Sequence, residues 1–447
     1  MLSIVLKNIL QLKISVLLLI FDNMSLWLQS IHQQWKGLHP TTRSIMLARA
    51  FRSLGQGALV VDLTLYLKAL QWSGFHIGWV LSLAGIMGAL LSLVVGISSD
   101  RMRRKPFLLL YECITMICSL LAFLTAQPLL LTIVIVIAGF GRGANGAAGP
   151  FSPVEQAWLA EEVLPEKRGK VYSWNTAMGF IGMGLGALLA IVPAFVHHHT
   201  LTLQYGVLVQ ASAYRPLFLI VTVATLCNLY LLYRAKENYN GKIVRESHPQ
   251  EVPIRRQENK MLAGLVFLNA FNGVAIGLTG PLISYWFALK FGKGPGEIAP
   301  MMAITFFITG IAAVFTGNIS EKKGIVTTVV YARAIGLILL LLLPLVPFFW
   351  MAAILYIARS ALNRGSVGAR QALTVSLVRD ERRGLATSLN AVSMQLPQSA
   401  GPSLSGWLFS AGNLGLPFYA GAACQAIYLV LYSRFFKHQN KPITNPS

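Results

Sequence analysis

The chain has 447 residues, of which 55% are hydrophobic and 12% are charged, and its mean hydropathy is +0.60. Soluble globular domains carry about twice this share of charged residues, so the composition excludes that class and indicates a protein whose solvent is the lipid bilayer. The net charge of +21 is compatible with nucleic-acid binding. However, most Lys and Arg residues lie in connections on one side of the predicted helices, as the positive-inside rule requires, so we expect no nucleic-acid partner.

Residues 1–42 form an N-terminal segment ahead of the first predicted span. Its residues 1–35 are largely apolar but include Lys7 and Lys13. Four interpretations stay open for this part: a thirteenth span, a signal peptide, an interfacial helix, or a start of translation at Met24.

Apolar runs of about 20 residues, the length that crosses the hydrocarbon core as a helix, recur along the rest of the chain. We predict an all-α integral membrane protein with twelve spans, near residues 44–70, 76–98, 107–126, 128–160, 171–195, 216–233, 261–289, 298–318, 326–346, 348–374, 385–410 and 415–434. The first six form an N-terminal bundle, residues 43–233, and the last six a C-terminal bundle, residues 261–436. Residues 234–260 are the predicted cytoplasmic linker and 437–447 a cytoplasmic tail, which places both termini in the cytoplasm.

An internal repeat supports two related halves. Residues 155–175 align without gaps to residues 370–390, and eight of the 21 positions are identical. Both segments cover a helix end, a charged connection and the start of the next helix. Spans 4 and 5 therefore correspond to spans 10 and 11, and such parallel repeats are typical of transporters that bind substrate between their halves.

The sequence GISSDRMRRK, residues 96–105, resembles the loop motif G-x-x-x-D-R-x-G-R-[RK] of the major facilitator superfamily. Arg103 stands where the motif has glycine, whereas the second copy, residues 317–324, keeps a glycine at this place. The resemblance assigns the motif and its charge network to Gly96, Asp100, Arg101 and Arg104, with Glu321 in the second half.

The fourth predicted span carries two further resemblances to this superfamily. Its sequence RGANG begins at Arg142 and is similar to the family motif R-x-x-x-G, whose arginine faces the central cavity. The sequence AEEVLPEKRG, residues 160–169, resembles the acidic P-E-x-R-G loop of the family. The resemblance implies that Glu161 pairs with Arg101 or Arg104, and that Arg168 and its counterpart Arg383 belong to the same network.

The chain is therefore identified as resembling a major facilitator superfamily transporter over residues 43–435. The resemblance implies two six-helix bundles around a central cavity, and the closest likeness is to bacterial drug/proton antiporters. One feature departs from the antiporters: span 5 lacks their Gly-Pro pair, which occurs instead as Gly401-Pro402 in span 11.

Charged residues inside predicted spans are costly, so they are candidates for cavity or proton-coupling roles. Arg49, Arg52 and Asp62 lie in span 1, Glu112 in span 3 and Arg142 in span 4. Asp62 either carries a proton or reaches water near the outer leaflet. Glu112 is expected to pair with a neighbouring helix, and Arg142 either faces the cavity or clamps span 1.

The repeat also places opposite charges at equivalent positions. Glu155 and Arg370 begin the two aligned segments. The pseudo-symmetry predicts that they face one another as an inner gate, closed when the cavity opens outward. The alternative is that each binds a separate helix end.

The leading hypothesis is a secondary active transporter in the cell (inner) membrane, acting as a monomer and coupled to protons. Efflux of amphipathic or drug-like compounds is the first expectation, import of a small metabolite is the second, and a non-transporting receptor or scaffold is the alternative of another class. No nucleotide-binding, metalloprotease or nucleophile motif occurs, so we expect neither an enzyme nor a cofactor or metal site.

Overall fold

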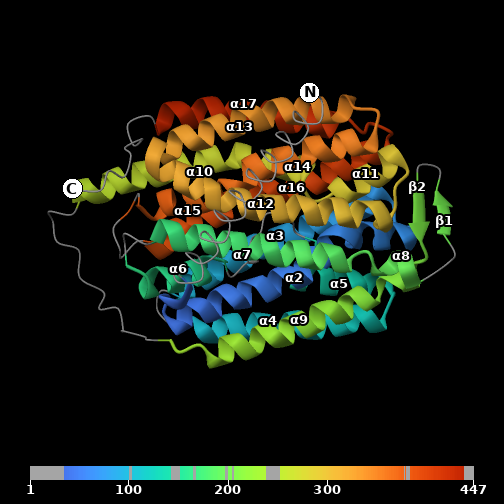
Figure 1. The fold of residues 1–447 in the computed structure, drawn as a ribbon, viewed down its shortest axis with the longest axis horizontal. Coiled ribbons are helices and arrows are strands. Elements are labelled where there is room, and N and C mark those ends of the chain that lie inside the picture. Colours follow the sequence, from blue (N-terminus) through green and yellow to red (C-terminus); the bar gives the residue numbers. More distant parts are fainter. Residues whose placement is uncertain are drawn as a thin grey trace, which may run out of the picture.

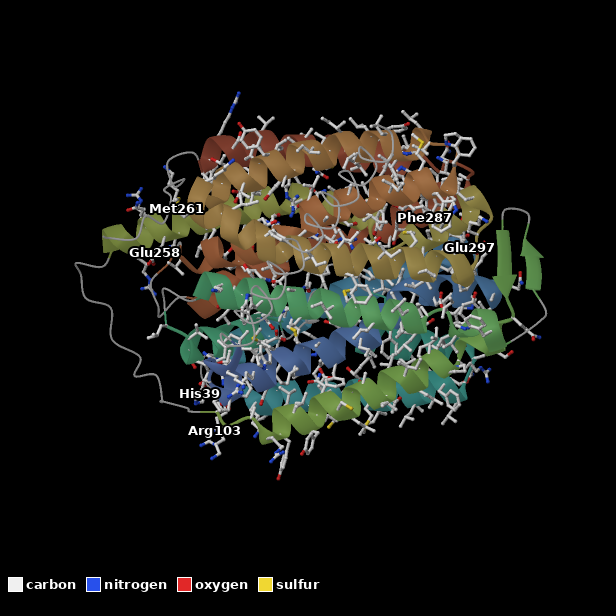
Figure 2. All side chains as sticks on the ribbon, in the orientation of Figure 1. His39, Arg103, Glu258, Met261, Phe287 and Glu297 are labelled. Atoms are coloured by element: carbon white, nitrogen blue, oxygen red, sulfur yellow. The ribbon has the colours of Figure 1, made fainter. Side chains whose placement is uncertain are left out.

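The computed structural model describes residues 35–99, 103–141, 152–164, 168–196, 200–203, 206–237, 252–376, 378 and 383–436. Two groups of long helices lie side by side, one from residues before the linker and one from residues after it (Figure 1). We call the end at which the linker leaves and re-enters the bundles the linker end, and the opposite end the hairpin end. Charged side chains mark both, with His39, Arg103 and Glu258 at the linker end and Glu297 at the hairpin end (Figure 2).

The N-terminal group contains the six predicted spans. Its elements are α2 (Pro40–Ala69), α3 (Gly74–Ser99), α4 (Lys105–Leu124), α5 (Pro128–Ala138), α6 (Ser152–Glu162), α7 (Arg168–Leu189), α8 (Val192–Val196), the 3-10 helix η3 (Ala211–Tyr214) and α9 (Pro216–Arg234). Prolines occupy the first turn of α2, α4, α5 and α9, where a missing N–H breaks no hydrogen bond. Span 4 consists of α5 and α6, because α5 ends at Gly139, whose φ of 67° is left-handed.

The C-terminal group repeats this plan. Its elements are α10 (Val252–Thr279), α11 (Ile283–Phe291), α12 (Pro295–Lys323), α13 (Ile325–Leu342), η5 (Leu343–Leu345), α14 (Phe349–Gly365), α15 (Val367–Ser376), α16 (Arg383–Ser410) and α17 (Leu416–Phe435). The predicted linker is too long, because residues 252–260 already belong to α10. Span 7 is interrupted between α10 and α11, where Pro281 has no N–H to continue the helix.

A short β-hairpin adds to the predicted all-α fold. Strand β1 (Thr200–Leu203) pairs in antiparallel register with β2 (Gly206–Val209) between α8 and η3. The two segments are rich in Thr, Val and Leu, residue types that tolerate the extended backbone. The hairpin lies in the connection between predicted spans 5 and 6, where no strand was predicted from the sequence.

Within the described part of the chain, eight helical segments are long and apolar enough to cross a membrane by length and composition. The predicted spans outside this set are the first (α2), the fourth (α5 and α6), the tenth (α14 and α15) and the eleventh (α16). Polar and charged residues are concentrated in α2, α6, α14, α15 and α16, and many of their side chains are buried. These helices hold polar groups inside the protein.

Among the described residues, the hydrophobic core that the two halves share lies at the hairpin end. One cluster of buried residues there includes Leu63 and Tyr66 of α2 together with Tyr285 and Trp286 of α11. At the linker end the buried apolar residues fall into separate clusters, one within the first half and two smaller ones within the second. The halves still meet there, because α7 packs against α12 and α15. The interface is therefore apolar at the hairpin end and more polar toward the linker end.

Candidate functional site

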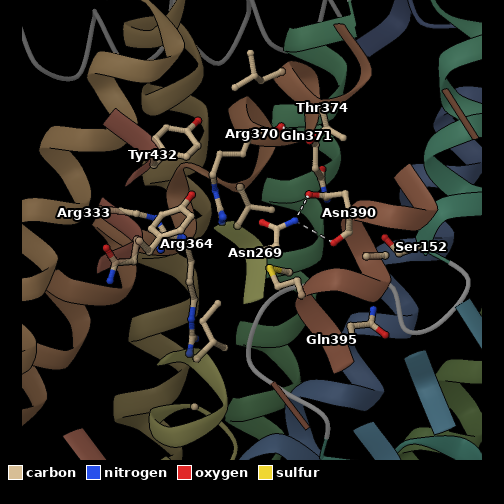
Figure 3. A pocket seen from close by; sticks show the side chains of 18 of the residues that line it. Ser152, Asn269, Arg333, Arg364, Arg370, Gln371, Thr374, Asn390, Gln395 and Tyr432 are labelled. Atoms are coloured by element: carbon tan, nitrogen blue, oxygen red, sulfur yellow. Dashed lines mark hydrogen bonds between the residues drawn. The ribbon is translucent and has the colours of Figure 1, made fainter. Parts of the chain in front are cut away.

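A cavity of about 120 Å³ lies between the halves on the linker-end side of the shared core (Figure 3). The first half contributes Arg49 of α2 and two residues of α6, and the second half contributes residues of α10 and α13 to α17. One water needs a volume of about 10 to 15 Å³, so the cavity is large enough for several waters or a small molecule. Polar residues in its wall include Arg49, Ser152, Gln156, Asn269, Thr279, Arg333, Arg359, Ser360, Asn363, Arg364, Arg370, Gln371, Asn390, Tyr428 and Tyr432.

Four arginines of the second half line this cavity. Arg333 comes from α13, Arg359 and Arg364 from α14, and Arg370 from α15. The side chains of Arg333, Arg359 and Arg364 are 3%, 8% and 8% exposed, so each is more than nine-tenths buried. Neutral groups are their hydrogen-bond acceptors, and a cluster of buried guanidinium groups results.

The contacts of these arginines leave donors unused. Arg333 donates from Nη1 to Asn272 Oδ1 at 2.6 Å and lies 4.8 Å from the ring centroid of Tyr428. Arg359 Nη2 reaches Thr279 Oγ1 at 3.4 Å, and Arg364 Nη2 donates to the Tyr356 hydroxyl at 3.2 Å. In these four arginines, the buried nitrogens without a hydrogen-bond partner among the described residues are Nε of Arg333, Arg359 and Arg370 and Nη1 of Arg364.

None of the described residues that line the cavity is acidic. Residues 261–436 contain four carboxylates: Glu297, Glu321, Asp380 and Glu381. Glu297 pairs with Lys293 at the hairpin end at 3.1 Å, and Glu321 lies two residues before the end of α12. The sequence of the cavity-lining helices of the second half, α10 from residue 261 and α13 to α17, therefore contains no carboxylate.

An amide cluster forms another part of the wall. Asn269 of α10 donates from Nδ2 to Asn390 Oδ1 at 2.9 Å and to Ser393 Oγ at 3.0 Å, joining α10 to α16 (Figure 3). The Oδ1 atom of Asn363, the Oγ atom of Ser360 and the hydroxyl of Tyr432 are buried without partners among the described residues. The cavity thus offers both donors and acceptors beside its positive charge.

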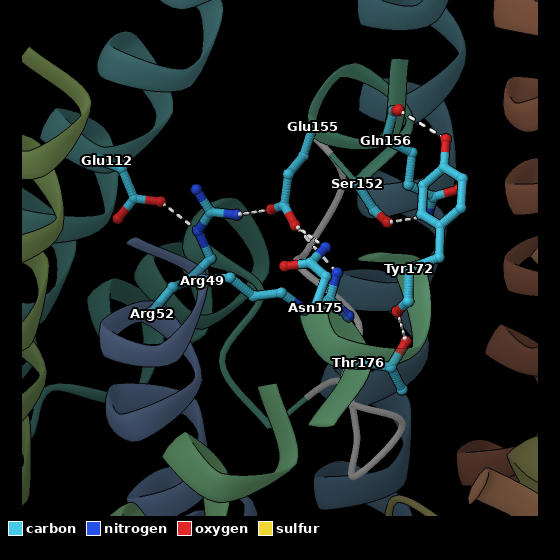
Figure 4. Close-up of polar contacts among 9 residues, drawn as sticks. All are labelled: Arg49, Arg52, Glu112, Ser152, Glu155, Gln156, Tyr172, Asn175 and Thr176. Atoms are coloured by element: carbon cyan, nitrogen blue, oxygen red, sulfur yellow. Dashed lines mark hydrogen bonds and ion pairs between the residues drawn. The ribbon is translucent and has the colours of Figure 1, made fainter. Parts of the chain in front are cut away.

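The first half holds a different arrangement, a buried cluster of two arginines and two glutamates (Figure 4). Glu155 of α6 accepts hydrogen bonds from Arg49 Nη1 and Arg52 Nη1, both at 3.0 Å, and Arg52 Nε donates to Glu112 of α4. Asn175 Nδ2 adds a bond to Glu155 at 3.0 Å. The cluster is neutral overall and links α2, α4, α6 and α7.

This cluster contains Glu155, one of the two residues of the predicted inner gate. Glu155 is held by Arg49 and Arg52 because α2 packs beside α6, and no ion pair joins it to Arg370, which lines the cavity in the other half. In this conformation the expected pair is therefore absent. A gate in the opposite conformation stays a prediction, and forming it would require Glu155 to leave two guanidinium groups.

The other sequence candidates divide into two sets. Arg104 donates to Glu161 through two hydrogen bonds, one of 2.9 Å, which is one of the two pairings expected from the loop motif. Glu237 completes this site by accepting the backbone N–H of Arg104 at 2.7 Å, at the start of α4. Asp100, Arg101 and Arg142 lie outside the described residues. The surroundings of Gly96 and the side chains of Arg168, Glu321 and Arg383 are likewise outside the described part of the structure.

Asp62 lies in α2 but not in the cavity wall. It is fully buried, and neither carboxylate oxygen has a hydrogen-bond partner among the described residues. Its chain neighbours Val61 and Leu63 belong to the core that both halves share. Of the predicted cavity candidates, the structure places Arg49 in the wall, and Arg52 and Glu112 behind it.

Arg333, Arg359 and Arg364 lie in predicted spans but were not among the predicted site residues. They come from two helices, α13 and α14, and no local motif joins all three. One signal was available: residues 261–436 place several arginines in spans that contain no acidic residue. Counting charge separately for each half would have found the cluster.

Comparisons with known proteins agree with this architecture. The Major Facilitator Superfamily profile matches residues 45–264 and 265–447, once for each half. Multidrug resistance protein MdtG from Proteus mirabilis is 23% identical over 424 residues, which cover 91% of this chain and 95% of that protein. Uncharacterized membrane protein YJR124C from Saccharomyces cerevisiae is 29% identical over 138 residues, or 31% of each chain.

Solved structures show the same fold. The crystal structure of a D-xylose-proton symporter superposes with a TM-score of 0.67 at 14% identity, covering 89% of this chain and 97% of the other. The sequence profile matches both halves of the chain, and the expected twelve-span, two-bundle fold is confirmed. The chain belongs to the major facilitator superfamily and is a multi-pass membrane transporter, not an enzyme.

Proposed function

We propose that the chain is a secondary active transporter that moves a small molecule by alternating access, with the cavity between its halves as the substrate site. The observation that carries this proposal is the asymmetry of the interface. One hydrophobic core joins the halves at the hairpin end, while a cavity with polar walls lies between them on the linker-end side of this core. Rocking of the halves about this cavity would exchange the closed and open ends.

We also propose the cell (inner) membrane as the location, with the linker end and both termini in the cytoplasm. The positive-inside distribution of Lys and Arg supports this orientation. The cavity then lies on the cytoplasmic side of the shared hydrophobic core.

The polar wall favours a small polar metabolite over an amphipathic, drug-like compound. Arginine, serine and glutamine side chains of the first half and arginine, asparagine and tyrosine side chains of the second line a cavity of about 120 Å³. The relatives are named for different cargo, a multidrug resistance protein and a symporter of D-xylose, and they share 23% and 14% of residues with this chain. The proposed substrate class is therefore supported by the residues that line the cavity and not by the names of the relatives. Flux measurements in proteoliposomes would determine the direction of transport.

Proton coupling is part of the proposal and rests on Asp62. A buried carboxylate without a partner is costly when charged, so protonation and release can accompany a change of surroundings. Asp62→Asn removes the titrating group at nearly constant shape. It should abolish uptake driven by a pH gradient in proteoliposomes while leaving substrate counterflow intact, and retained gradient-driven uptake would count against coupling at this residue.

Labelling with a membrane-impermeant maleimide tests alternating access. In a background with Cys113, Cys118, Cys227 and Cys424 replaced by alanine, Gln371→Cys places a thiol in the cavity wall and Ser82→Cys places one in the closed interface. We expect labelling of the first alone in the resting protein, and labelling of the second during turnover. Ligand binding without any flux and without labelling of Ser82→Cys would favour the receptor alternative.

A further inference from the structure

We propose that the substrate is a small organic or inorganic oxyanion with two or more negative charges, such as a dicarboxylate, a tricarboxylate or a phosphate compound. The inference rests on the proposed function and adds the substrate class. Its basis is the set of four cavity-lining arginines in the second half, Arg333, Arg359, Arg364 and Arg370, which we call the arginine cluster.

The first step is electrostatic. A buried charge is costly unless a counter-charge or several hydrogen bonds compensate for it. The arginine in the cavity wall from the first half, Arg49, already has Glu155 as its partner. The arginine cluster instead has neutral partners, and the positive charges of Arg359 and Arg370 act on Arg333. The resting cavity therefore carries an uncompensated positive charge.

The second step is hydrogen bonding. Buried donors in proteins nearly always have an acceptor, and here one nitrogen on each of the four guanidinium groups has none among the described residues. The donors come from three helices and line one cavity. A ligand with several oxygen acceptors would satisfy donors on more than one helix at once.

The third step is the choice of ligand chemistry. A guanidinium group has a planar fork of donors that matches carboxylate and phosphate oxygens. The same wall holds the unpartnered Asn363 Oδ1, Ser360 Oγ and Tyr432 hydroxyl, which suit hydroxyl groups of a substrate. Cation–π contact with Tyr428 stabilises Arg333 in part, but it uses none of its N–H donors. A cationic or wholly apolar cargo would leave the cluster uncompensated.

The binding test uses purified full-length protein and isothermal titration calorimetry. The probes are succinate, citrate, inorganic phosphate and glucose 6-phosphate, with succinamide and glucose as uncharged counterparts. We expect at least one multivalent oxyanion to bind and its uncharged counterpart not to bind. The carboxylate and phosphate arms distinguish the two sources of oxyanion, and failure of all four oxyanions to bind would overturn the proposal.

Substitutions locate the binding site. Arg359→Gln and Arg364→Gln should each weaken binding of that probe by about 10- to 100-fold, because a hydrogen bond to a charged group is lost. Arg370→Gln, at a less buried position, is a third variant. Arg234→Gln removes an exposed guanidinium at the end of α9 and serves as the matched control with unchanged binding. Equal affinity in all variants would overturn the proposal.

A thermal-stability measurement separates ligand binding from a structural role. If the arginines bind substrate, Arg359→Gln relieves repulsion and leaves the Tm of the ligand-free protein unchanged or higher, and a given concentration of probe raises the Tm of the wild type more than that of the variant. A structural clamp predicts a lower Tm for the variant instead. Flux of an uncharged compound, unaffected by the arginine variants, would refute the oxyanion substrate but keep the transporter. Absence of all flux would refute the transporter itself.

Discussion

Glu155 illustrates how a single carboxylate can balance two buried cations. Arg49 and Arg52 lie one turn apart on α2, and each donates to a different oxygen of Glu155 at 3.0 Å. Glu112 compensates Arg52 from the other side. Because all four side chains are buried, their mutual attraction is weakly screened by solvent, whereas in the pair of Arg104 and Glu161 the glutamate is half-exposed.

Glu155→Gln should therefore destabilise the protein strongly. The substitution leaves two buried guanidinium groups with one carboxylate between them, and breaking a buried ion pair costs about 3 to 5 kcal/mol. Thermal unfolding of the purified protein in detergent measures the loss as a lower Tm.

Glu161→Gln is the matched control for this experiment. The Glu161 side chain is 48% exposed, and a pair of this kind contributes about 0 to 1 kcal/mol. A Tm decrease in this variant as large as that of Glu155→Gln would contradict a special role for the buried cluster.

At the scale of elements, α2 and α7 approach each other through glycine. A Cβ on Gly182 would overlap the carbonyl oxygen of Ala50, and one on Gly186 would overlap that of Leu54. Glycines four residues apart form one face of a helix and let two backbones come close, as is common in membrane proteins. The contact joins spans 1 and 5 within the first half into a tightly packed pair.

Gly186→Ala tests this contact. The added methyl group must displace the backbone of α2, and overpacking of this kind lowers the free energy of unfolding by about 1 to 3 kcal/mol. The measurement is again the thermal unfolding of the purified protein.

Gly169→Ala in the same helix is the control, because a Cβ there meets no atom within 4 Å. Alanine favours a helix over glycine by up to about 1 kcal/mol, so the Tm should stay the same or rise. Equal decreases in the two variants would show that the α2–α7 contact does not determine the effect.

Hydropathy predicted the existence of the twelve spans because long apolar helices have a strong local signal. It did not predict the break between α14 and α15, which separates Gly365 from Val367, or the β-hairpin, because both features involve only a few residues. The break between α10 and α11 coincides with Pro281, which a strict use of proline as a helix breaker would have found. The part of α10 before residue 261 was missed because its polar side chains hide a helix that continues from the span.

At the scale of the whole molecule, the repeat predicted two halves but not the partners across them. Glu155 and Arg370 hold equivalent positions, yet the partner of each depends on which helices pack beside it. Pseudo-symmetry of the backbone does not extend to charge: the first half pairs its buried arginines with carboxylates, and the second does not. Such differences arise from tertiary packing, so the repeat alone could not reveal them.

A disulfide across the closed interface should stop the transport cycle. Ser82 of α3 and Ser403 of α16 join the halves near the hairpin end, with their hydroxyl oxygens 2.6 Å apart. In the background without native cysteines, oxidation of the Ser82→Cys, Ser403→Cys double variant should lock the resting conformation. Flux in proteoliposomes should fall to the level of empty liposomes and return after reduction.

The single variants Ser82→Cys and Ser403→Cys control for the substitutions themselves. Ligand binding should persist in the oxidised protein, because neither Ser82 nor Ser403 lines the cavity. Unchanged flux in the demonstrably cross-linked protein would show that the hairpin-end interface does not open during transport.

The unpaired arginine cluster also makes the carrier sensitive to voltage. A conformational change that exposes the cavity on the other side of the bilayer shifts positive charge within the membrane field, where each elementary charge moved fully across contributes about 2.3 kcal/mol per 100 mV. An anion bound to the cluster cancels part of that charge. Membrane potential should therefore act most strongly on the return of the empty carrier, and the cell's electrical gradient would set how fast each cycle restarts.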